Sequence, residues 1–267
     1  MKQYGIIGHP LGHTMSPTLH NWGFKQHGIN AIYEAWPTSP EDLPAFMEQY
    51  RREQVQGLSI TIPHKQAIIP MLDRLTNRAR AVGAVNTLFW ENETLIGDNT
   101  DVAGVVNPIK SRNIAPESAL ILGAGGAARA AVAGCQELGV LAIGITNRTK
   151  SKAETIALDF GIEVVDWDLR HDLSPELLIN STPLGMSGDL ELLSPWNATH
   201  LTEEMTIFDL VYNPLETVFL ENGLQAGATT IQGIEMFLSQ GLEQFRLWTG
   251  IALDSEGARN LLLEKLT

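Results

Sequence analysis

Residues 119–128 have the sequence ALILGAGGAA, and an alanine-rich segment follows them to Leu138. Four apolar residues followed by glycines predict a short buried strand that ends in a tight turn, and the alanines predict a helix. Gly123, Gly125 and Ala128 have the spacing with which a strand–turn–helix unit binds a dinucleotide. The glycines let main-chain amides approach a pyrophosphate, and the N-terminus of the helix favours its charge. The alternative is a glycine-rich turn without a ligand, but the strand and helix around it favour a nucleotide.

Strands and helices alternate on both sides of this stretch. Helices are predicted to start at Ser16, as the N-cap before Pro17, and over residues 40–52, with Glu41 and Asp42 in the first turn. Further helical stretches are predicted through Arg80 and over residues 150–160. Apolar runs predict strands at residues 4–8, 31–36, 58–62, 85–90, 94–96, 141–146, 163–165, 177–180 and 206–210. The strands at 85–90 and 94–96 are predicted to form a hairpin around residues 91–93. This alternation predicts an α/β fold with a parallel, doubly wound sheet.

The composition limits the classes of function. The chain has 267 residues, of which 44% are hydrophobic and 18% charged, and this suits two globular domains. Its formal net charge of −13 disfavours sequence-independent nucleic-acid binding, which needs cations to neutralise phosphates. One cysteine, Cys135, allows no internal disulfide, and the 7 histidines have no metal-ligand spacing, so we expect no metal. The N-terminus does not resemble a signal peptide, and no apolar run reaches the ~20 residues of a membrane span, so we expect a cytoplasmic protein.

The segment after the next predicted strand indicates which nucleotide is bound. Residues 147–152 read NRTKSK and contain no acid. An NAD site usually has Asp or Glu here for the ribose hydroxyls, whereas Arg148, Thr149 and Lys152 would bind a 2′-phosphate. The alternative is a basic surface loop in which Thr149 or Ser151 caps the following helix. Given the glycine turn upstream, the sequence favours NADP.

Polar side chains follow several apolar runs in the first half of the chain. They are Thr14 with Ser16, Thr61 with Lys65, Asn86 with Thr87, and Asn99 with Thr100 and Asp101. In open α/β sheets, ligands bind outside the carboxyl ends of the strands, so these side chains are expected to converge there. Hydroxyls, an amide, one ammonium and one carboxylate suit a small polyhydroxylated carboxylic acid better than an apolar ligand.

Lys65 and Asp101 are the candidate acid–base pair for reduction of a ketone. Hydride addition builds negative charge on the ketone oxygen, which a nearby ammonium stabilises and protonates. A neighbouring carboxylate can hold that ammonium and a substrate hydroxyl in position. From spacing alone, the simpler interpretation is a solvated lysine at a helix start and an aspartate that caps a helix over residues 102–109.

Several motifs, in order along nearly the whole chain, resemble one family. The first half has GHPLGHTMSP at 8–17, followed by His20 and Asn21, TIPHK at 61–65, GAVNT at 83–87 and GDNTD at 97–101. The second half has GAGGAAR at 123–129, NRT at 147–149, NSTPLGM at 180–186, DLVYNP at 209–214 with Thr217, and the segments 233–240 and 245–250. Together they are similar to the shikimate dehydrogenase family.

The resemblance implies an α/β fold of two domains with a cleft between them, and reversible NADPH-dependent reduction of 3-dehydroshikimate to shikimate on the route to chorismate and aromatic amino acids. It implies a substrate-binding catalytic domain over residues 1–102 and 235–267, and a Rossmann-type NADP-binding domain over 103–234. It makes Lys65 the acid–base group and Asp101 its partner. Further substrate ligands are expected at Thr14, Ser16, Thr61, Asn86, Tyr212 and Gln240. Cofactor ligands are expected at Asn77, Gly123, Ala124, Gly125, Gly126, Ala127, Asn147, Arg148, Thr149, Lys150, Ser151, Lys152, Leu210 and Gly233.

Three residues depart from the family pattern. Thr14 stands where the family usually has Ser, Ser59 replaces the usual Asn, and Val102 follows Asp101 where Gly is common. The first two bear on the choice between shikimate and quinate, so a quinate or shikimate dehydrogenase of broader substrate or NAD preference is one alternative. A non-catalytic dinucleotide-binding module is another, disfavoured because it needs no acid–base pair. We expect small-molecule partners, no nucleic acid and no membrane, and either a monomer or a homodimer.

Overall fold

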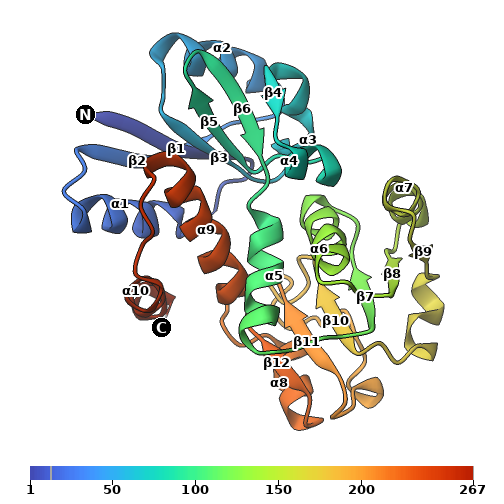
Figure 1. The fold of residues 1–267 in the computed structure, drawn as a ribbon. Coiled ribbons are helices and arrows are strands. Elements are labelled where there is room, and N and C mark those ends of the chain that lie inside the picture. The colour runs from blue at the N-terminus through green and yellow to red at the C-terminus, as the bar shows by residue number, and fades with distance from the viewer. Residues whose placement is uncertain (13, 267) are drawn as a thin grey trace. The chain divides into compact units, whose positions relative to one another are not determined.

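Two compact units make up the chain in the computed structural model, which describes residues 1–12 and 14–266. The first unit contains Met1–Thr100 and Gln240–Lys265, and the second contains Asp101–Ser239. Each has a six-stranded sheet (Figure 1). The expected functional boundaries at residues 102 and 235 stay a prediction. Along the described residues, no helix is both long and apolar enough to cross a membrane.

The first unit is built on a mixed sheet with the strand order β2-β1-β3-β5-β6-β4. β1 is parallel to β2 and β3, whereas β5 is antiparallel to β3 and β6. Its elements are β1 (Lys2–Gly8), α1 (Ser16–Gln26), β2 (Ala31–Pro37), α2 (Leu43–Glu53), β3 (Gly57–Ile60), α3 (His64–Ala67), the 3₁₀ turn η1 (Ile69–Met71), β4 (Arg74–Leu75), α4 (Asn77–Val82), β5 (Thr87–Glu91) and β6 (Thr94–Asp98). The later part of α9 (Gly233–Thr249) and α10 (Ser255–Leu266) complete it.

Alternation along β1 buries side chains on both faces of this sheet. Ile7 packs in a cluster with Met47 of α2. Ile6, the preceding residue, packs in a different cluster with Phe24 of α1 and Phe245 of α9. Because helices cover both faces, the loops at the strand ends are where a ligand reaches the sheet.

The second unit has a fully parallel sheet with the strand order β9-β8-β7-β10-β11-β12. Its elements are α5 (Asp101–Ser111), β7 (Ser118–Leu122), α6 (Gly126–Glu137), β8 (Ala142–Thr146), α7 (Lys150–Phe160), β9 (Glu163–Val164), η2 (Trp167–Asp172), β10 (Leu177–Asn180), η3 (Ala198–His200), β11 (Thr206–Asp209), α8 (Val218–Gln225), β12 (Thr229–Ile231) and the start of α9. Numbered along the unit, this is the order 3-2-1-4-5-6 of dinucleotide-binding sheets. The order reverses between β7 and β10, so a ligand crevice is expected beside the glycine turn.

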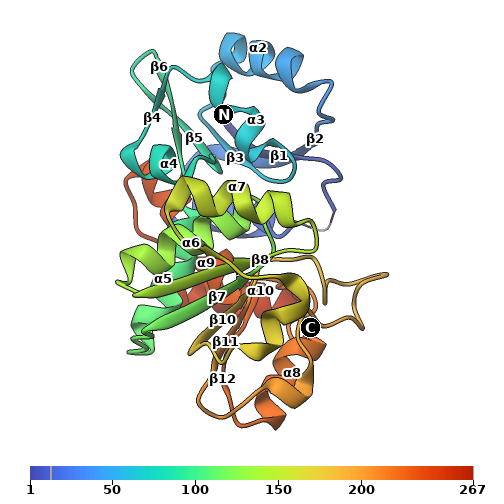
Figure 2. The ribbon, with the colours of Figure 1, turned by 90° about the vertical axis from the view of Figure 1, so that its right-hand side faces the viewer.

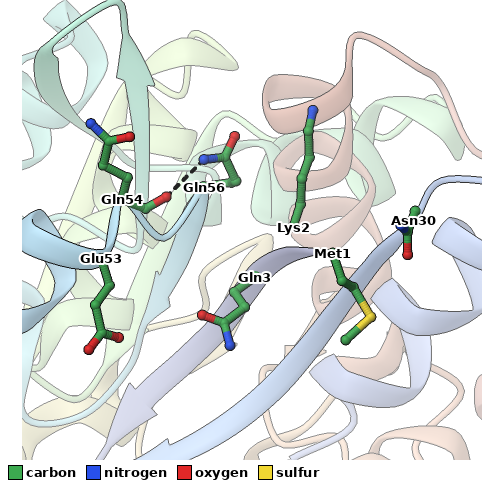
Figure 3. Close-up of a pocket in the computed structure, with 7 residues that line it drawn as sticks. All are labelled: Met1, Lys2, Gln3, Asn30, Glu53, Gln54 and Gln56. Atoms are coloured by element: carbon green, nitrogen blue, oxygen red, sulfur yellow. Dashed lines mark hydrogen bonds between the residues drawn. The ribbon is translucent and has the colours of Figure 1, made fainter.

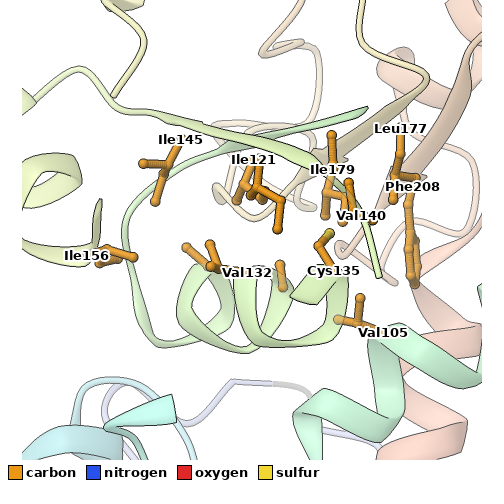
Figure 4. Close-up of a cluster of buried hydrophobic side chains, with 14 of the residues drawn as sticks. Val105, Ile121, Val132, Cys135, Val140, Ile145, Ile156, Leu177, Ile179 and Phe208 are labelled. Atoms are coloured by element: carbon orange, nitrogen blue, oxygen red, sulfur yellow. The ribbon is translucent and has the colours of Figure 1, made fainter. Parts of the chain in front are cut away.

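The core of the second unit follows the same alternation. Ile121 and Ile179 point toward Val132 and Cys135 of α6 (Figure 4). Leu120 packs on the opposite face, where α8 covers β11 and β12 (Figure 2). The predicted strand–turn–helix unit at residues 119–138 is therefore the centre of this core.

Some predicted elements were wrong in detail. The helical stretch predicted through Arg80 is divided into α3, η1, β4 and α4, because Pro70 cannot donate to a helix bond and the backbone becomes extended at Leu72. Glu41 and Asp42 precede α2, whose first turn holds a proline. Ser16 lies within α1, and Met15 takes the N-cap position.

Candidate functional site

The loop after β1 carries two hydroxyls that were expected to bind a carboxylate. The Oγ1 atom of Thr14 lies 3.3 Å from the Oγ of Ser16 and accepts a hydrogen bond from the Ser16 main-chain N–H, also at 3.3 Å. Ser16 is buried. His13, in the same motif, lies outside the described residues. The two hydroxyls therefore lie together at the N-terminus of α1.

Lys65 lies in the first turn of α3, after the loop that follows β3. The main-chain N–H of Thr61 donates to the carbonyl of Ile7 at 3.0 Å, and that of His64 donates to the carbonyl of Thr61 at 2.9 Å. The ring of His64 is buried, and its Nε2 lies 2.8 Å from the carbonyl of Thr38. A carbonyl only accepts, so Nε2 carries the hydrogen. These bonds fix the backbone under Lys65, whose side chain is half-buried.

The segment Val85–Asn86 joins the backbone at Lys65 to the residue before Asp101. The main-chain N–H of Val85 donates to the carbonyl of Lys65 at 2.7 Å. The Asn86 side chain accepts from the Thr100 N–H at 2.7 Å and donates to its Oγ1 at 2.9 Å. α5 begins at Asp101 itself, and Asp101 is buried. Val85 thus holds the backbone at Lys65, and Asn86 holds the backbone at the residue before Asp101, the other member of the predicted acid–base pair.

Asp98 holds the start of the same loop. It accepts a bidentate pair of hydrogen bonds from Arg78, at 3.1 and 2.6 Å, and one from the hydroxyl of Thr76 at 2.6 Å. Burial raises the pKa of Asp98, but these bonds outweigh it and hold the pKa below its ordinary value. The carboxylate therefore stays ionised at neutral pH. Asn77, between the two donors, is exposed at the first position of α4.

The glycine turn at 123–127 depends on glycine at its first position. Gly123 has a φ of +109°, and a Cβ there would lie 2.7 Å from the Oγ of Ser181, so glycine is required. A Cβ on Gly125, the N-cap of α6, would meet nothing within 4 Å. Among the described residues, no side chain caps this helix. The predicted pyrophosphate site at this turn stays a prediction.

Basic side chains gather at the start of α7. Thr149 takes the N-cap position, but within the described chain its side chain makes no capping bond, and Ser151 lies inside the helix. The Lys150 ammonium lies 3.5 Å from the carboxylate of Asp166. The side chains of Arg148, Thr149, Lys150, Ser151 and Lys152 are exposed, and that of Asn147 is half-buried. A side-chain capping role therefore does not account for Thr149.

Asp209 ties together the ends of β10 and β11. Its carboxylate accepts from the Thr217 hydroxyl at 2.6 Å, from the Asn180 side-chain amide at 2.9 Å and from the Val211 N–H at 3.0 Å. Burial raises its pKa to about 6, against the opposing effect of these bonds. The main-chain N–H of Leu210 donates to the carbonyl of Asn180 at 2.9 Å. The loop that carries Leu210 is thus held by a buried carboxylate.

The start of α9 packs closely against the same loop. A Cβ on Gly233 would lie 2.2 Å from the carbonyl oxygen of Val211, so this approach requires glycine. The rings of Tyr212 and Phe237 pack with their centroids 4.8 Å apart. Gln240 lies farther along α9, in the part that belongs to the first unit.

The predicted residues therefore form two sets. The first unit holds the expected substrate ligands of its loops together with Lys65, Asn77 and Gln240. The second unit holds Asp101, Tyr212 and the remaining expected cofactor ligands. Sequence reasoning missed Asp209 and Gln244 as structural parts of these loops. Gln244 did give a signal, because it follows Gln240 by one helical turn on an amphipathic helix.

A pocket of about 500 Å³ lies elsewhere in the first unit. It is lined by Met1, Lys2, Gln3, Asn30, Glu53, Gln54 and Gln56 (Figure 3). It lies at the amino end of β1, whereas Thr14, Thr61 and Lys65 follow the carboxyl ends of β1 and β3. It is therefore separate from the candidate site.

Comparisons with known proteins agree with the motifs. Residues 6–88 match the family model described as the shikimate dehydrogenase substrate binding domain, and residues 233–263 match the shikimate 5′-dehydrogenase C-terminal domain. A shikimate dehydrogenase (NADP(+)) from Maridesulfovibrio salexigens is 56% identical, over 99% of this chain and 97% of that protein.

Solved structures agree as well. The shikimate 5-dehydrogenase of Thermus thermophilus, in complex with NADP(H) and shikimate, is 35% identical with a TM-score of 0.90, covering 99% of each chain. The quinate dehydrogenase of Corynebacterium glutamicum, in complex with NAD, is 28% identical with a TM-score of 0.89, covering 98% of this chain and 99% of that one. With identity of 56% along nearly its whole length to a named member, and with the motif loops at the ends of its strands, this chain belongs to the shikimate dehydrogenase family.

Proposed function

We propose that this protein is an NADP-dependent shikimate dehydrogenase that reversibly reduces 3-dehydroshikimate to shikimate, a step of chorismate and aromatic amino acid biosynthesis. The observation that carries the proposal is the Val85–Asn86 segment, which holds the backbones leading to Lys65 and Asp101. A nucleotide-binding module without catalysis has no need of that arrangement. The family match over the whole chain supports the same activity.

The residues of the second unit fit the cofactor. The turn at Gly123–Ala127 would offer the main-chain amides at the start of α6 to a pyrophosphate, and Arg148 and Lys152 would offer exposed cations to a 2′-phosphate. Leu210 and Gly233, on the loop and helix fixed by Asp209, would border the nicotinamide side, with Asn77 as a contact from the first unit. When bound, NADPH supplies a hydride to the carbonyl carbon of the substrate.

Substrate binding falls to hydroxyls and amides. Thr14 and Ser16 would donate to the substrate carboxylate at the N-terminus of α1, where the helix dipole also favours an anion. Ring hydroxyls would meet Thr61, Asn86, Tyr212 and Gln240, which offer both donors and acceptors. This donor set suits a polyhydroxylated acid.

Lys65 would act as the acid–base group. Its ammonium stabilises the negative charge that builds on the substrate oxygen and then transfers a proton to that oxygen. The Asp101 carboxylate would hold the ammonium and a substrate hydroxyl in register. In the oxidative direction the same lysine, unprotonated, accepts the hydroxyl proton.

One assay tests the function. The purified protein is given shikimate or quinate with NADP⁺ or NAD⁺, and absorbance of the reduced nicotinamide is followed. We expect efficient turnover only with shikimate and NADP⁺. Equal turnover of quinate, or a preference for NAD⁺, would contradict the proposal in favour of a quinate dehydrogenase.

We further propose a cytoplasmic location, on the evidence of a single buried cysteine and small-molecule substrates.

A further inference from the structure

Gln244 lies at the centre of a buried hydrogen-bond chain in the first unit, and no part of the proposed mechanism uses it. Its side chain is 1% exposed. The amide nitrogen donates to the main-chain carbonyl of Asn86 at 3.1 Å and to the hydroxyl of Thr87 at 2.9 Å. The amide oxygen lies 2.9 Å from the hydroxyl of Ser59. All the polar atoms of this side chain are therefore engaged.

The direction of the chain follows from its chemistry. The carbonyl of Asn86 only accepts, so Gln244 presents its NH₂ group there and its oxygen toward Ser59. Ser59 must then donate to Gln244 and accept from the hydroxyl of Tyr33, 2.6 Å away. Burial raises the pKa of Tyr33, so this phenol keeps its proton.

The two ends of the chain lead to expected substrate ligands. At one end, the main chain of Tyr33 exchanges two hydrogen bonds with the side chain of Asn21 in α1, at 2.9 and 2.8 Å, and α1 begins at Ser16. At the other end, the Thr87 hydroxyl donates to Oδ1 of Asn86 at 2.7 Å. The chain thus connects α1 with the Asn86 amide just before β5, and Gln244 is the link between them.

We propose that Gln244 is a positioning residue of the substrate site, which holds α1, with Ser16 at its start, and Asn86 in one register through Ser59 and Tyr33. This inference rests on the proposed function. A buried polar group that loses its hydrogen-bond partner lowers the stability of the fold. The hydrogen-bond chain therefore has one arrangement in which every buried group has a partner. Without the Gln244 side chain, Ser16 and Asn86 can move independently of each other. The affinity for shikimate is then lowered, whereas nucleotide binding and the rate of proton transfer are unchanged.

The test compares Gln244→Met, which keeps length and removes every hydrogen bond, with Thr249→Val on the same helix. Thr249 donates to the carbonyl of Phe245 at 2.7 Å and lies outside the chain of bonds, so it is a matched loss of a helix-side hydrogen bond. We expect Gln244→Met to raise the KM for shikimate by about ten-fold, with kcat and the KM for NADP⁺ within about two-fold of wild type. Thr249→Val is expected to leave all three values near wild type.

A double-mutant cycle adds Tyr33→Phe, which keeps the buried ring and removes only the hydroxyl. If Gln244 and Tyr33 act through the same hydrogen-bond chain, the double variant should raise the KM for shikimate by less than the product of the two fold-increases of the single variants. Tyr33→Phe alone is expected to raise it as well, and this variant carries the test if Gln244→Met does not fold. The thermal midpoint of each variant shows whether it is folded.

Three outcomes would overturn the inference. These are an unchanged KM for shikimate in both variants, equal increases for shikimate and NADP⁺, and a strictly multiplicative double variant. A wild-type protein that does not oxidise shikimate would instead count against the proposed function, so the two failures are distinguishable.

Discussion

Lys65 is held by its backbone on two sides, through the loop that begins at Thr61 and through Val85. We expect Lys65→Ala to lower kcat by a factor of ~10²–10⁴ and to change the KM for shikimate much less, because proton transfer matters mainly in the transition state. Steady-state kinetics in both directions measure this. Lys25→Ala, at the exposed end of α1, is the matched control and should retain wild-type kinetics.

Asp101→Asn separates two roles for the partner carboxylate. A loss mainly in kcat is the expected result, because the amide no longer stabilises the lysine ammonium. An increase in KM alone would make Asp101 a substrate-binding group only. A Lys65→Ala enzyme with near-normal kcat would remove the lysine from the mechanism.

Arg148 is the residue on which the choice of nucleotide depends most. Its exposed guanidinium at the start of α7 suits a bidentate contact with a 2′-phosphate. We expect Arg148→Asp to raise the KM for NADP⁺ by about 10–100-fold and that for NAD⁺ little, since NAD⁺ lacks the phosphate. Arg80→Asp, an exposed change on α4, is the control. Equal losses with both nucleotides would show that Arg148 supports the fold instead.

Thr14 places a methyl group beside the expected carboxylate site. Shikimate is flat at the carbon that bears the carboxylate, whereas quinate is tetrahedral there and has an extra hydroxyl, so the methyl should disfavour quinate. We expect Thr14→Ser to keep shikimate turnover within about a few-fold and to admit quinate slightly better, since one methyl is worth at most about 1–3 kcal/mol. Comparison of kcat/KM for both acids measures it. Abolished quinate turnover in Thr14→Ser would reverse the argument.

At the scale of the elements, Asp209 makes the ends of β10 and β11 sensitive to pH. Its pKa of about 6 in the folded chain lies above the ordinary value of 3.8, so protonation favours folding. The free energy of unfolding of the second unit should therefore gain up to roughly 3 kcal/mol from this group as the pH falls from 7.5 through 6 to 4.

Asp209→Asn is the matched variant, because its side chain has the same shape and can still accept from Asn180 and Val211. It lacks the titration, so the stability difference between wild type and variant should shift in favour of wild type as the pH falls. Amide hydrogen exchange of β10 and β11 at pH 7.5 and 4.5 measures the difference. A difference that does not change with pH would show that the carboxylate titrates normally.

Elements with strong local patterns were predictable. The glycine turn, the hairpin of β5 and β6 and the strands of the second unit all follow from apolar runs ended by turn residues. The division of residues 64–82 was not predictable from pattern, because α3 and β4 are too short to show periodicity. β12 was missed for the same reason.

The candidate site was predictable as a set of loops, but its supports were not. Thr14, Ser16 and Lys65 stand out because each follows a strand, whereas Asn86 directly precedes β5. Gln244 and Ser59 are far apart in sequence, and only packing brings their side chains to 2.9 Å. The network that joins them is a tertiary property, which single-sequence patterns do not encode.

At the scale of the whole molecule, the two sheets differ in kind. The sequence pattern predicted one parallel, doubly wound type, which the second unit has, whereas the first unit inserts the antiparallel strand β5 between β3 and β6. Short strands joined by the tight turn at Asn92 allow antiparallel pairing, whereas the helical crossovers of the second unit impose parallel pairing.

Ligand binding should distinguish the two units. We expect NADP⁺ to slow amide exchange mainly at residues 119–127 and 145–152, and shikimate to slow it mainly at residues 58–65 and 84–88, because a ligand stabilises the unit that it contacts. Hydrogen–deuterium exchange with mass spectrometry, with each ligand alone, measures this. Protection of residues 58–65 and 84–88 by NADP⁺ alone would contradict the proposed assignment of residues 1–102 and 103–234.

The buried thiol in the core of the second unit has a practical consequence. Cys135 is the one cysteine of the sequence, it is 0% exposed, and burial raises its pKa to about 12. Maleimide reagents react with thiolates, so the buried and protonated thiol of Cys135 does not react with them at neutral pH. A cysteine placed at exposed Leu158 of α7 would then be the sole labelling target, and a fluorophore there would report nucleotide binding without prior removal of the native residue.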